Sequence, residues 1–296
     1  MSLMIERVDD DNAQRLIQYC AERGPEHDTS FLPGQGFVAS PEEPAYLLQQ
    51  HGQDVGAVAL LRSPRYLSAG RGRFAIFHSI LDSTEAYTRM FEAIRPHVRD
   101  LRKVYLFIPE KKRSTAVILT HLGFHIERYS FVLIQRDPSR QEVRFPEGFV
   151  VEPLSPTQQA GIEQYAHCIN ECFADLAGHT DLPPDDVRGW FDEANYLEDG
   201  ICLLKWGEQA VGTLCVQREY GNNSGAEVSG LGIVSPFRGR GLGRMLLRYA
   251  GAFALRRGFL TVVLSVNAEN ESALGLYRSE GYELIDTVVC YALDCA

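Results

Sequence analysis

The chain has 296 residues, of which 45% are hydrophobic and 23% charged, and its formal net charge is 29 − 39 = −10. This composition supplies apolar material for about two packed domains, and it excludes a disordered, collagen-like or coiled-coil protein. No apolar run approaches the roughly 18 residues of a membrane span and no secretory leader is recognisable, so we expect a cytoplasmic protein with reduced cysteines.

The charge is divided unevenly between the two halves of the chain. Residues 1–145 contain 19 Lys and Arg against 18 Asp and Glu, whereas residues 146–296 contain 10 against 21. The acidic second half opposes bulk nucleic-acid binding, because phosphate is repelled by such a field. It would attract a small cationic partner, although a solvated acidic surface is the commoner explanation. We therefore expect neither a nucleic-acid nor a membrane partner, and the sequence leaves oligomerisation open.

The first half alternates strands with helices. The apolar periodicity and the turn residues between the runs define each element. The expected strands are 5–8, 45–51, 55–61, 74–80, 104–108 and 131–134, and the expected helices are 11–22, 83–98 and 114–121.

A polar segment with two prolines and no apolar period follows, at residues 138–148. It is typical of a linker. We therefore predict a first domain over residues 1–137 and a second over 149–296.

The second half repeats the element order of the first. Leu122-Gly123-Phe124 ends a helix in the first half, as Glu280-Gly281-Tyr282 does in the second. Two copies of one unit that mixes helices and strands explain this better than a single large domain. The expected strands are 149–154, 201–206, 209–217, 227–234, 260–266, 282–286 and 288–293, and the expected helices begin near residues 155, 183, 242 and 270.

A glycine-rich turn lies between strand 227–234 and the helix that begins at Leu242. Its sequence is Ser235-Pro236-Phe237-Arg238-Gly239-Arg240-Gly241-Leu242-Gly243. Glycines let a backbone approach a ligand, and a helix start offers unpaired N–H groups at a positive dipole end. Arg238, Arg240 and Arg244 add positive charge inside an acidic half. The turn therefore predicts a site for an anion, most simply a pyrophosphate.

Two other nucleotide motifs do not fit this turn. The dinucleotide fingerprint needs G-x-G-x-x-G after a first strand, whereas this turn reads G-x-G-x-G late in its domain. The phosphate-binding loop of nucleoside triphosphatases requires Gly-Lys-Ser/Thr, which does not occur in the chain.

Arg238-x-x-Gly241-x-Gly243 after a strand resembles the acetyl-CoA signature of the GNAT N-acetyltransferase superfamily. Asn267, Asn270, Ala273, Tyr277 and Gly281-Tyr282 resemble its later motifs in order and spacing, so that the resemblance covers about residues 147–294. The first half has the element order, but residues 78–83 lack the arginine-glycine turn. The chain thus looks like a tandem GNAT protein with a degenerate first copy, the layout of mycothiol-synthase-like proteins.

The resemblance implies an α/β fold of the mixed, α+β kind: two mostly antiparallel sheets, each flanked by helices, with splayed strands at the cofactor cleft. It implies transfer of an acetyl group from acetyl-CoA to a deprotonated small amine or N-terminal amino group, without a metal. Ile233 and Val234 would hold the pantetheine arm through their N–H groups, and residues 238–244 would hold the pyrophosphate. The cofactor-binding candidates are Ile233, Val234, Arg238, Gly239, Arg240, Gly241, Leu242, Gly243, Arg244, Asn270, Ala273 and Tyr277.

Two residues are candidates for proton transfer. Tyr277 could protonate the leaving thiolate, or it could be a core tyrosine. Glu227 lies six residues before Ile233, so a period of two would place both on the same side of the strand, with Glu227 as the base. A surface carboxylate at a strand start is the alternative; Ser229, on the same face, could order a water. Asn270 could bind the pantetheine arm or cap its helix.

The acid-rich stretch 175–199 corresponds to the family's cover over the acceptor. Asp181 and Asp192 could bind a cationic amine, whereas Asp185 and Asp186 fit the first turn of a helix better. His167, Cys168, Cys172 and His179 lack the spacing of a metal site, and we expect no metal. The alternative to an enzyme is a non-catalytic CoA-binding sensor or scaffold with the same fold.

Overall fold

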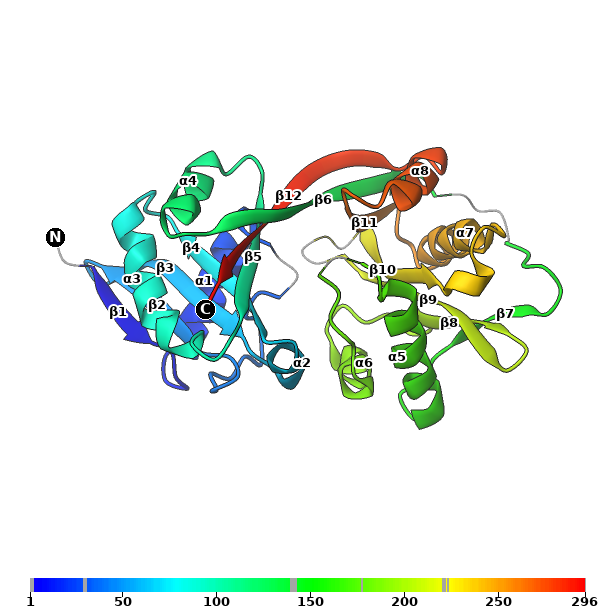
Figure 1. The fold of residues 1–296 in the computed structure, drawn as a ribbon, viewed down its shortest axis with the longest axis horizontal. Coiled ribbons are helices and arrows are strands. Elements are labelled where there is room, and N and C mark those ends of the chain that lie inside the picture. The colour runs from blue at the N-terminus through cyan, green and yellow to red at the C-terminus, as the bar shows by residue number, and fades with distance from the viewer. Residues whose placement is uncertain are drawn as a thin grey trace. The chain divides into compact units, whose positions relative to one another are not determined.

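The computed structural model describes residues 3–28, 31–138, 143–176, 178–219, 222 and 224–295. The chain folds into two compact units, one of Met1–Ser130 with Asp286–Ala296 and the other of Phe131–Ile285. Each unit is built on a sheet with helices packed against it (Figure 1).

The sheet of the first unit follows the order β1-β2-β3-β4-β5, and then takes in parts of β12 and β6. Strands β4 and β5 are parallel, and β12 is antiparallel to β5. The strands are β1 (Met4–Arg7), β2 (Ala45–Gln50), β3 (Gln53–Leu61), β4 (Arg71–Ser79), β5 (Lys103–Pro109), β6 (His125–Arg136) and β12 (Glu283–Asp294). The helices are α1 (Ala13–Arg23), α2 (Pro64–Ser68), α3 (Thr84–Ile94) and α4 (Arg113–His121), with 3₁₀ turns η1 (Gly24–Glu26) and η2 (Arg95–His97).

Helices cover both faces of this sheet. Val58 of β3 packs in one core cluster with α3 and α4, whereas Ala57 and Ala59 on either side of it pack in another with α1. Successive side chains of a strand point to opposite faces, so an almost wholly apolar strand is what burial on both sides requires.

The second unit contains the order β6-β11-β10-β9-β8-β7, with the first residues of β12 beside β6. Its other strands are β7 (Phe149–Pro153), β8 (Ile201–Trp206), β9 (Gln209–Arg218), β10 (Gly225–Ile233) and β11 (Thr261–Asn267). Its helices are α5 (Gln159–Phe173), α6 (Pro184–Gly189), α7 (Leu242–Arg256) and α8 (Glu271–Ser279), with 3₁₀ turns η3 (Trp190–Asp192) and η4 (Ser235–Phe237).

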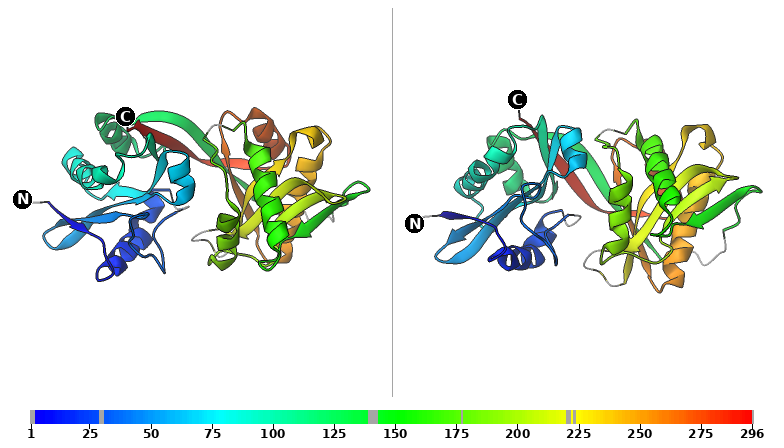
Figure 2. Two further views of the ribbon diagram at one scale, coloured as in Figure 1. Left: turned by 60° about the horizontal axis from the view of Figure 1, so that its bottom comes forward. Right: turned by 90° about the horizontal axis from the view of Figure 1, so that it is seen from below.

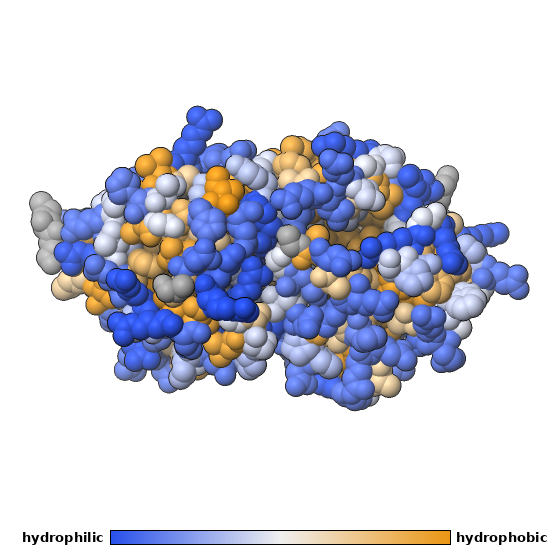
Figure 3. Space-filling model, viewed as in Figure 1, coloured by the Kyte–Doolittle hydropathy of each residue, from blue (hydrophilic) through white to orange (hydrophobic). Residues whose placement is uncertain are grey.

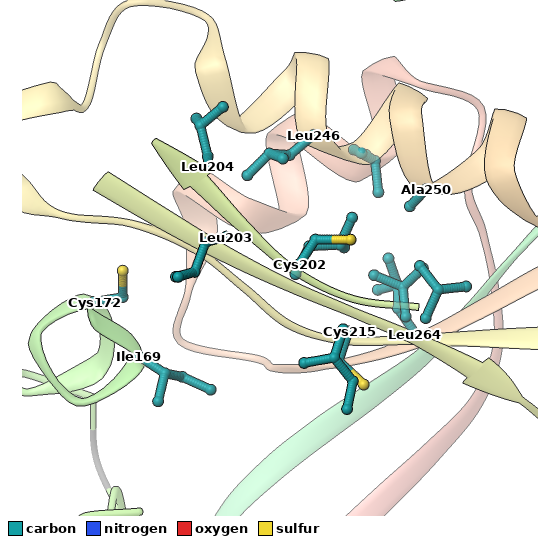
Figure 4. Packing of buried hydrophobic residues seen from close by; sticks show 14 of the residues in the cluster. Ile169, Cys172, Cys202, Leu203, Leu204, Cys215, Leu246, Ala250 and Leu264 are labelled. Carbon is teal, nitrogen blue, oxygen red and sulfur yellow. The ribbon is translucent and has the colours of Figure 1, made fainter. Parts of the chain in front are cut away.

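Helices α5 and α7 lie on opposite faces of this second sheet (Figure 2). The close view shows the alternation that produces this arrangement: Leu204 of β8 points toward Leu246 of α7, and the neighbouring Leu203 points toward α5 (Figure 4). All three leucines are buried. The predicted architecture, a sheet flanked by helices in each half, is confirmed.

The last strand of each half runs on into the other unit. Strand β6 begins in the first unit and ends in the second, where Leu133 is 1% exposed in the core. Strand β12 begins in the second unit and ends in the first, where Val288–Asp294 pairs with Pro109–Lys103 of β5. Its Val289 and Cys290 are buried on opposite faces of the first sheet.

The structure therefore divides the chain differently from the predicted ranges 1–137 and 149–296. The predicted strands 282–286 and 288–293 form one continuous strand, because the chain stays extended through Thr287, whose carbonyl accepts a hydrogen bond from Glu110 N–H at 2.9 Å. The predicted strand 131–134 is the middle of the longer β6. Of the predicted linker 138–148, residues 139–142 lie outside the described residues.

The surface carries hydrophilic side chains interspersed with hydrophobic ones on the face drawn in Figure 3. Among the residues that the structure describes, no helix is both long and apolar enough to cross a membrane.

Candidate active site

Strands β10 and β11 separate part-way along their length. They pair in parallel from Gly225 with Thr261 to Val228 with Leu264. Strand β10 nevertheless continues to Ile233 and β11 to Asn267. The splayed strand pair expected at the cofactor cleft is thus present in the second unit.

A β-bulge lies in the splayed part of β10. The register against β9 shifts between Ser229 and Gly232, and Gly230 has φ +57°. The hydroxyl of the fully buried Thr213 donates to the Gly230 carbonyl at 2.6 Å. A Cβ at Gly230 would lie 3.0 Å from the Tyr165 hydroxyl oxygen. Glycine is therefore required here by conformation, and α5 packs close against the strand.

The bulge overturns the prediction that Glu227 and Ile233 lie on the same side of β10. Glu227 pairs with Gln217 and Ile233 pairs with Gly212 of the regular strand β9. Positions 217 and 212 differ in parity, so their partners face opposite sides of the sheet. Glu227 shares the α5 face with Ser229, and Gln217 Nε2 donates to its carboxylate at 3.2 Å.

The backbone of β10 offers one of its two predicted N–H groups to the opening. Val234 N–H donates to the Val211 carbonyl at 3.0 Å, so its predicted role in holding the pantetheine arm is wrong. Antiparallel strands alternate between residues that bond their neighbour and residues that point away. Ile233 N–H therefore points away from β9, to the side where β11 has diverged.

The glycine turn follows directly, between η4 and α7. Gly239 and Gly241 have φ values of +76° and +77°. An added Cβ would meet no atom within 4 Å at either position. The left-handed backbone, rather than crowding, thus selects glycine here.

The turn leaves a run of N–H groups unpaired. The first bond of α7 runs from Met245 N–H to the Gly241 carbonyl at 3.1 Å. Within the described chain, the N–H groups of residues 239–244 donate to no backbone or side-chain acceptor. Together with the helix dipole they form a favourable place for a diphosphate.

The three arginines of this region are already engaged. Arg238 Nε donates to the Ile233 carbonyl at 2.9 Å and Nη2 to the Cys172 carbonyl at 2.8 Å. Arg240 donates to the Pro236 carbonyl at 3.1 Å and lies over the Phe237 ring. Arg244 pairs with Glu280 at 2.5 Å. The side chains of Arg238 and Arg244 are thus bound to groups of the chain itself, and their predicted role toward a phosphate stays a prediction.

Glu280 is a site residue that sequence reasoning missed. Its side chain is 9% exposed and also accepts from Arg248 Nε at 2.7 Å. Burial opposes ionisation, but the guanidinium groups of Arg248 and Arg244 outweigh it and hold the Glu280 pKa below its usual range. Only its place directly before Gly281 marked it in the sequence.

Two tyrosines lie together near the end of α8. Tyr277 is 8% exposed, and burial raises its pKa to about 12. Its ring centroid is 5.9 Å from that of Tyr282. The Tyr282 hydroxyl is buried and has no hydrogen-bond partner among the described residues, a feature that the sequence did not reveal.

Asn270 caps α8, which was one of its two predicted roles. Its Oδ1 accepts from Ala273 N–H at 3.1 Å. The Ala273 N–H is thus taken within the chain, which removes it as a donor to a ligand. Asp185 and Asp186 lie in the first turn of α6, as predicted. Across the described residues, no three His, Cys, Asp or Glu side chains are grouped to hold a metal.

The first unit contains the same kind of opening, but its own side chains occupy it. Strands β4 and β5 pair only from Arg71 with Lys103 to Arg73 with Tyr105. Beyond that point, Phe77 N–H donates to His27 Nε2 at 3.2 Å. Phe77 is the counterpart of Ile233, since each N–H points away from the preceding strand of its sheet.

More contacts fill this opening in the first unit. Asp28 pairs with the buried Arg73, and Glu26 pairs with Lys112. His78 Nδ1 lies 2.9 Å from the Tyr19 hydroxyl. After β4, where the second unit has its glycine turn, the chain satisfies its own N–H groups: Leu81 N–H donates to Ser79 Oγ and Ser83 N–H to the Leu81 carbonyl.

A family comparison agrees with this geometry. Residues 163–282 match the model of the acetyltransferase (GNAT) family. The matched residues make up most of the second unit, which is thus similar to a GNAT acetyltransferase domain.

Individual relatives support the same family and the tandem layout. A mycothiol acetyltransferase of Nocardiopsis dassonvillei is 33% identical over 120 residues, which are 38% of this chain and 34% of the relative. Another, of Streptomyces scabiei, is 28% identical over 163 residues, or 52% of this chain and 49% of the relative. The chain thus matches a third to a half of the length of these relatives. A tandem GNAT protein from the clavulanic acid biosynthesis pathway superposes with TM-score 0.69 and 13% identity, covering 100% of this chain and 99% of that protein.

Proposed function

We propose that the second unit transfers the acetyl group of acetyl-CoA to an amine. The observation that carries this proposal is the run of N–H groups at residues 239–244 that find no acceptor among the described residues. It comes directly after a splayed strand that points the Ile233 N–H into the opening. A diphosphate next to a thioester-bearing arm fits these two features together. The GNAT match over 163–282 supports the same cosubstrate.

Each part of the site has a separate task in this proposal. The turn binds the diphosphate through backbone N–H groups, and Ile233 N–H holds and polarises the acyl-bearing arm. Acetyl-CoA supplies an activated thioester whose carbonyl carbon a neutral amine attacks directly. Glu227 remains the candidate base: it lies on the α5 face with Ser229, opposite to the side chain of Ile233, and would accept the amine proton through a water.

Tyr277 stabilises the leaving sulfur. Its pKa of about 12 lies above the value of about 8.5 of an ordinary thiol, so the phenol remains protonated while the sulfur departs. Its main contribution is then a hydrogen bond to the sulfur rather than outright release of its proton. The acidic balance of residues 146–296, 10 basic against 21 acidic, favours a cationic amine as acceptor.

The test is release of free CoA thiol from acetyl-CoA with a panel of small amines and peptides. Because the curated relatives are named mycothiol acetyltransferases, the panel includes the unacetylated form of mycothiol. We expect turnover with at least one primary amine and none with the same amine acetylated beforehand. Tight binding of acetyl-CoA without transfer to any amine would instead identify a CoA sensor, and absence of binding would refute the proposal.

A further inference from the structure

Arg238 joins three elements that border the splayed opening. It begins the glycine turn, directly after η4. Its guanidinium donates from Nε to the Ile233 carbonyl at the end of β10, and from Nη2 to the Cys172 carbonyl in the last turn of α5. The turn, the strand and the helix are thus held by one side chain.

The contact between α5 and β10 beneath this side chain is unusually close. A Cβ placed on Gly232 would lie 2.7 Å from Cys172 Cβ and 3.1 Å from its Sγ. The last turn of α5 therefore packs directly on the strand next to the opening, and only glycine leaves room for it. Arg238 spans the same junction from the side of the turn.

Both acceptors of Arg238 would otherwise lack a donor of this strength. Cys172 lies in the last turn of α5, where carbonyl groups have no further partner along the helix. In an antiparallel strand the N–H and C=O of one residue point to the same side. The Ile233 carbonyl therefore faces the opening between β10 and β11, as its N–H does. An unpaired carbonyl there would repel an anion bound at the turn, and the guanidinium removes that repulsion.

We propose that Arg238 is a positioning residue which couples the cofactor turn to helix α5, and not a ligand of the phosphate. The inference rests on the proposed function of the same site. Binding of the diphosphate orders the turn, and the hydrogen bonds of Arg238 then also restrict the motion of the last turn of α5. The segment after α5 leads to the acidic cover of the predicted acceptor site, so the coupling sets where the acceptor amine meets the thioester.

The test compares the full-length wild type with Arg238→Ala by hydrogen–deuterium exchange, with and without CoA. The backbone of Arg238 is extended, at φ −66° and ψ 161°, so alanine alters the side chain alone. We expect CoA to protect both the turn and residues 168–173 in the wild type, but only the turn in the variant. With acetyl-CoA and an amine, kcat should fall roughly tenfold to a hundredfold while KM for acetyl-CoA changes less than about threefold.

Arg102→Ala is the matched control, because Arg102 also donates to a main-chain carbonyl, that of Ala69 at 2.8 Å, and lies in the first unit. It should leave both exchange and kinetics unchanged. Arg238→Gln keeps one donor group and should recover part of kcat; it also replaces Arg238→Ala if that variant does not fold.

The outcomes separate this inference from the proposed function. If Arg238→Ala weakens CoA binding more than about tenfold and leaves exchange in α5 as in the wild type, Arg238 is a phosphate ligand and the coupling is refuted. If the coupled protection is seen but no amine is acetylated, the coupling holds and the proposed function fails. If the wild type does not bind CoA, both are refuted.

Discussion

At the scale of single residues, Tyr277 is the side chain whose chemistry can be tested most cleanly. The change Tyr277→Phe removes the hydroxyl but keeps the ring that packs against Tyr282. We expect kcat to fall by about 10²-fold with little change in stability or in CoA binding, because the lost hydrogen bond acts on the leaving sulfur. Tyr249→Phe, on α7 and outside the site, is the matched control.

The pH profile gives the same residue a second readout. Burial raises the Tyr277 pKa to about 12, so the phenol is still protonated at pH 10. The wild type should therefore show no loss of kcat from this group below about pH 11. An alkaline decline centred near pH 9 that disappears in Tyr277→Phe would contradict the assignment.

His78 offers a test of the filled opening in the first unit. Burial, followed by repulsion from His27, lowers its pKa from 6.5 to about 4. The unfolded chain then binds more protons than the folded chain between those two pH values. The free energy of unfolding should fall as pH drops from 6.5 to 4, by at most about 1.4 kcal/mol per pH unit for this group.

The measurement is denaturant unfolding of the full chain at a series of pH values. His78→Asn removes the titrating ring and should show a shallower decline, even if it is less stable at pH 7. The exposed His121→Asn serves as control and should keep the wild-type slope. Equal slopes in wild type and His78→Asn would show that His78 is not a buried neutral ring.

Residue types at this site were predictable from sequence, but their partners were not. The glycines and arginines of the turn could be found because their spacing is local. Arg238 donates to the carbonyl of Cys172, 66 positions away, and this contact depends on how α5 packs on β10. The same holds for Val234, whose N–H donates to the Val211 carbonyl.

At the scale of elements, the glycine turn is specified by backbone conformation. Gly241 is the N-cap of α7 with φ +77° and open space around it. Gly241→Ala should therefore destabilise the second unit by about 1–2 kcal/mol and weaken CoA binding, because the side chain disfavours the left-handed backbone.

Gly275 provides the opposite substitution as a control. It lies on the exposed face of α8, in helical conformation, with no atom within 4 Å of an added Cβ. Gly275→Ala should stabilise the chain by roughly 0.5–1 kcal/mol and leave CoA binding unchanged. Thermal unfolding and calorimetric titration of both variants check the pair, and equal effects on binding would contradict the role of the turn.

Element order in each half followed from periodicity, whereas the bulge in β10 did not. The sequence Ser229-Gly230-Leu231-Gly232 reads as an ordinary strand segment, and two glycines alone do not show where the register shifts. The shift depends on Thr213 and Tyr165, which come from other elements. It reverses the face of every residue beyond it, which is why the predicted side of Glu227 relative to Ile233 was wrong.

At the scale of the whole molecule, the exchange of terminal strands decides which fragments can fold. A fragment 149–296 lacks Phe131–Arg136, which lies between β11 and β12 in the strand order and carries the buried Leu133. Gln135 Nε2 also donates to the Glu280 carbonyl at 2.6 Å. We expect fragment 149–296 to unfold or aggregate, and fragment 131–285 to fold and bind CoA.

Circular dichroism, thermal unfolding and CoA titration of the two fragments check this expectation. A cooperative, CoA-binding fragment 149–296 would contradict the importance of β6 to the second unit. Sequence reasoning placed the domain boundary in the polar segment after residue 137, because composition marks the linker. It could not show the exchange, since pairing between distant strands leaves no local signal.

The two units also differ in what their openings contain. In the second, the N–H groups of residues 239–244 have no acceptor within the described part of the chain, and the end of β10 has diverged from β11. In the first, His27 accepts the N–H of Phe77 and the chain after β4 bonds to itself. The repeat visible in the sequence is thus a repeat of fold, with the glycine turn in one copy.

Calorimetric titration of the full chain with acetyl-CoA tests this account most directly. We predict one binding site per chain, which weakens in Gly241→Ala and remains in His27→Ala. Two equivalent sites, or a site that survives Gly241→Ala and disappears when the first unit is altered, would contradict it.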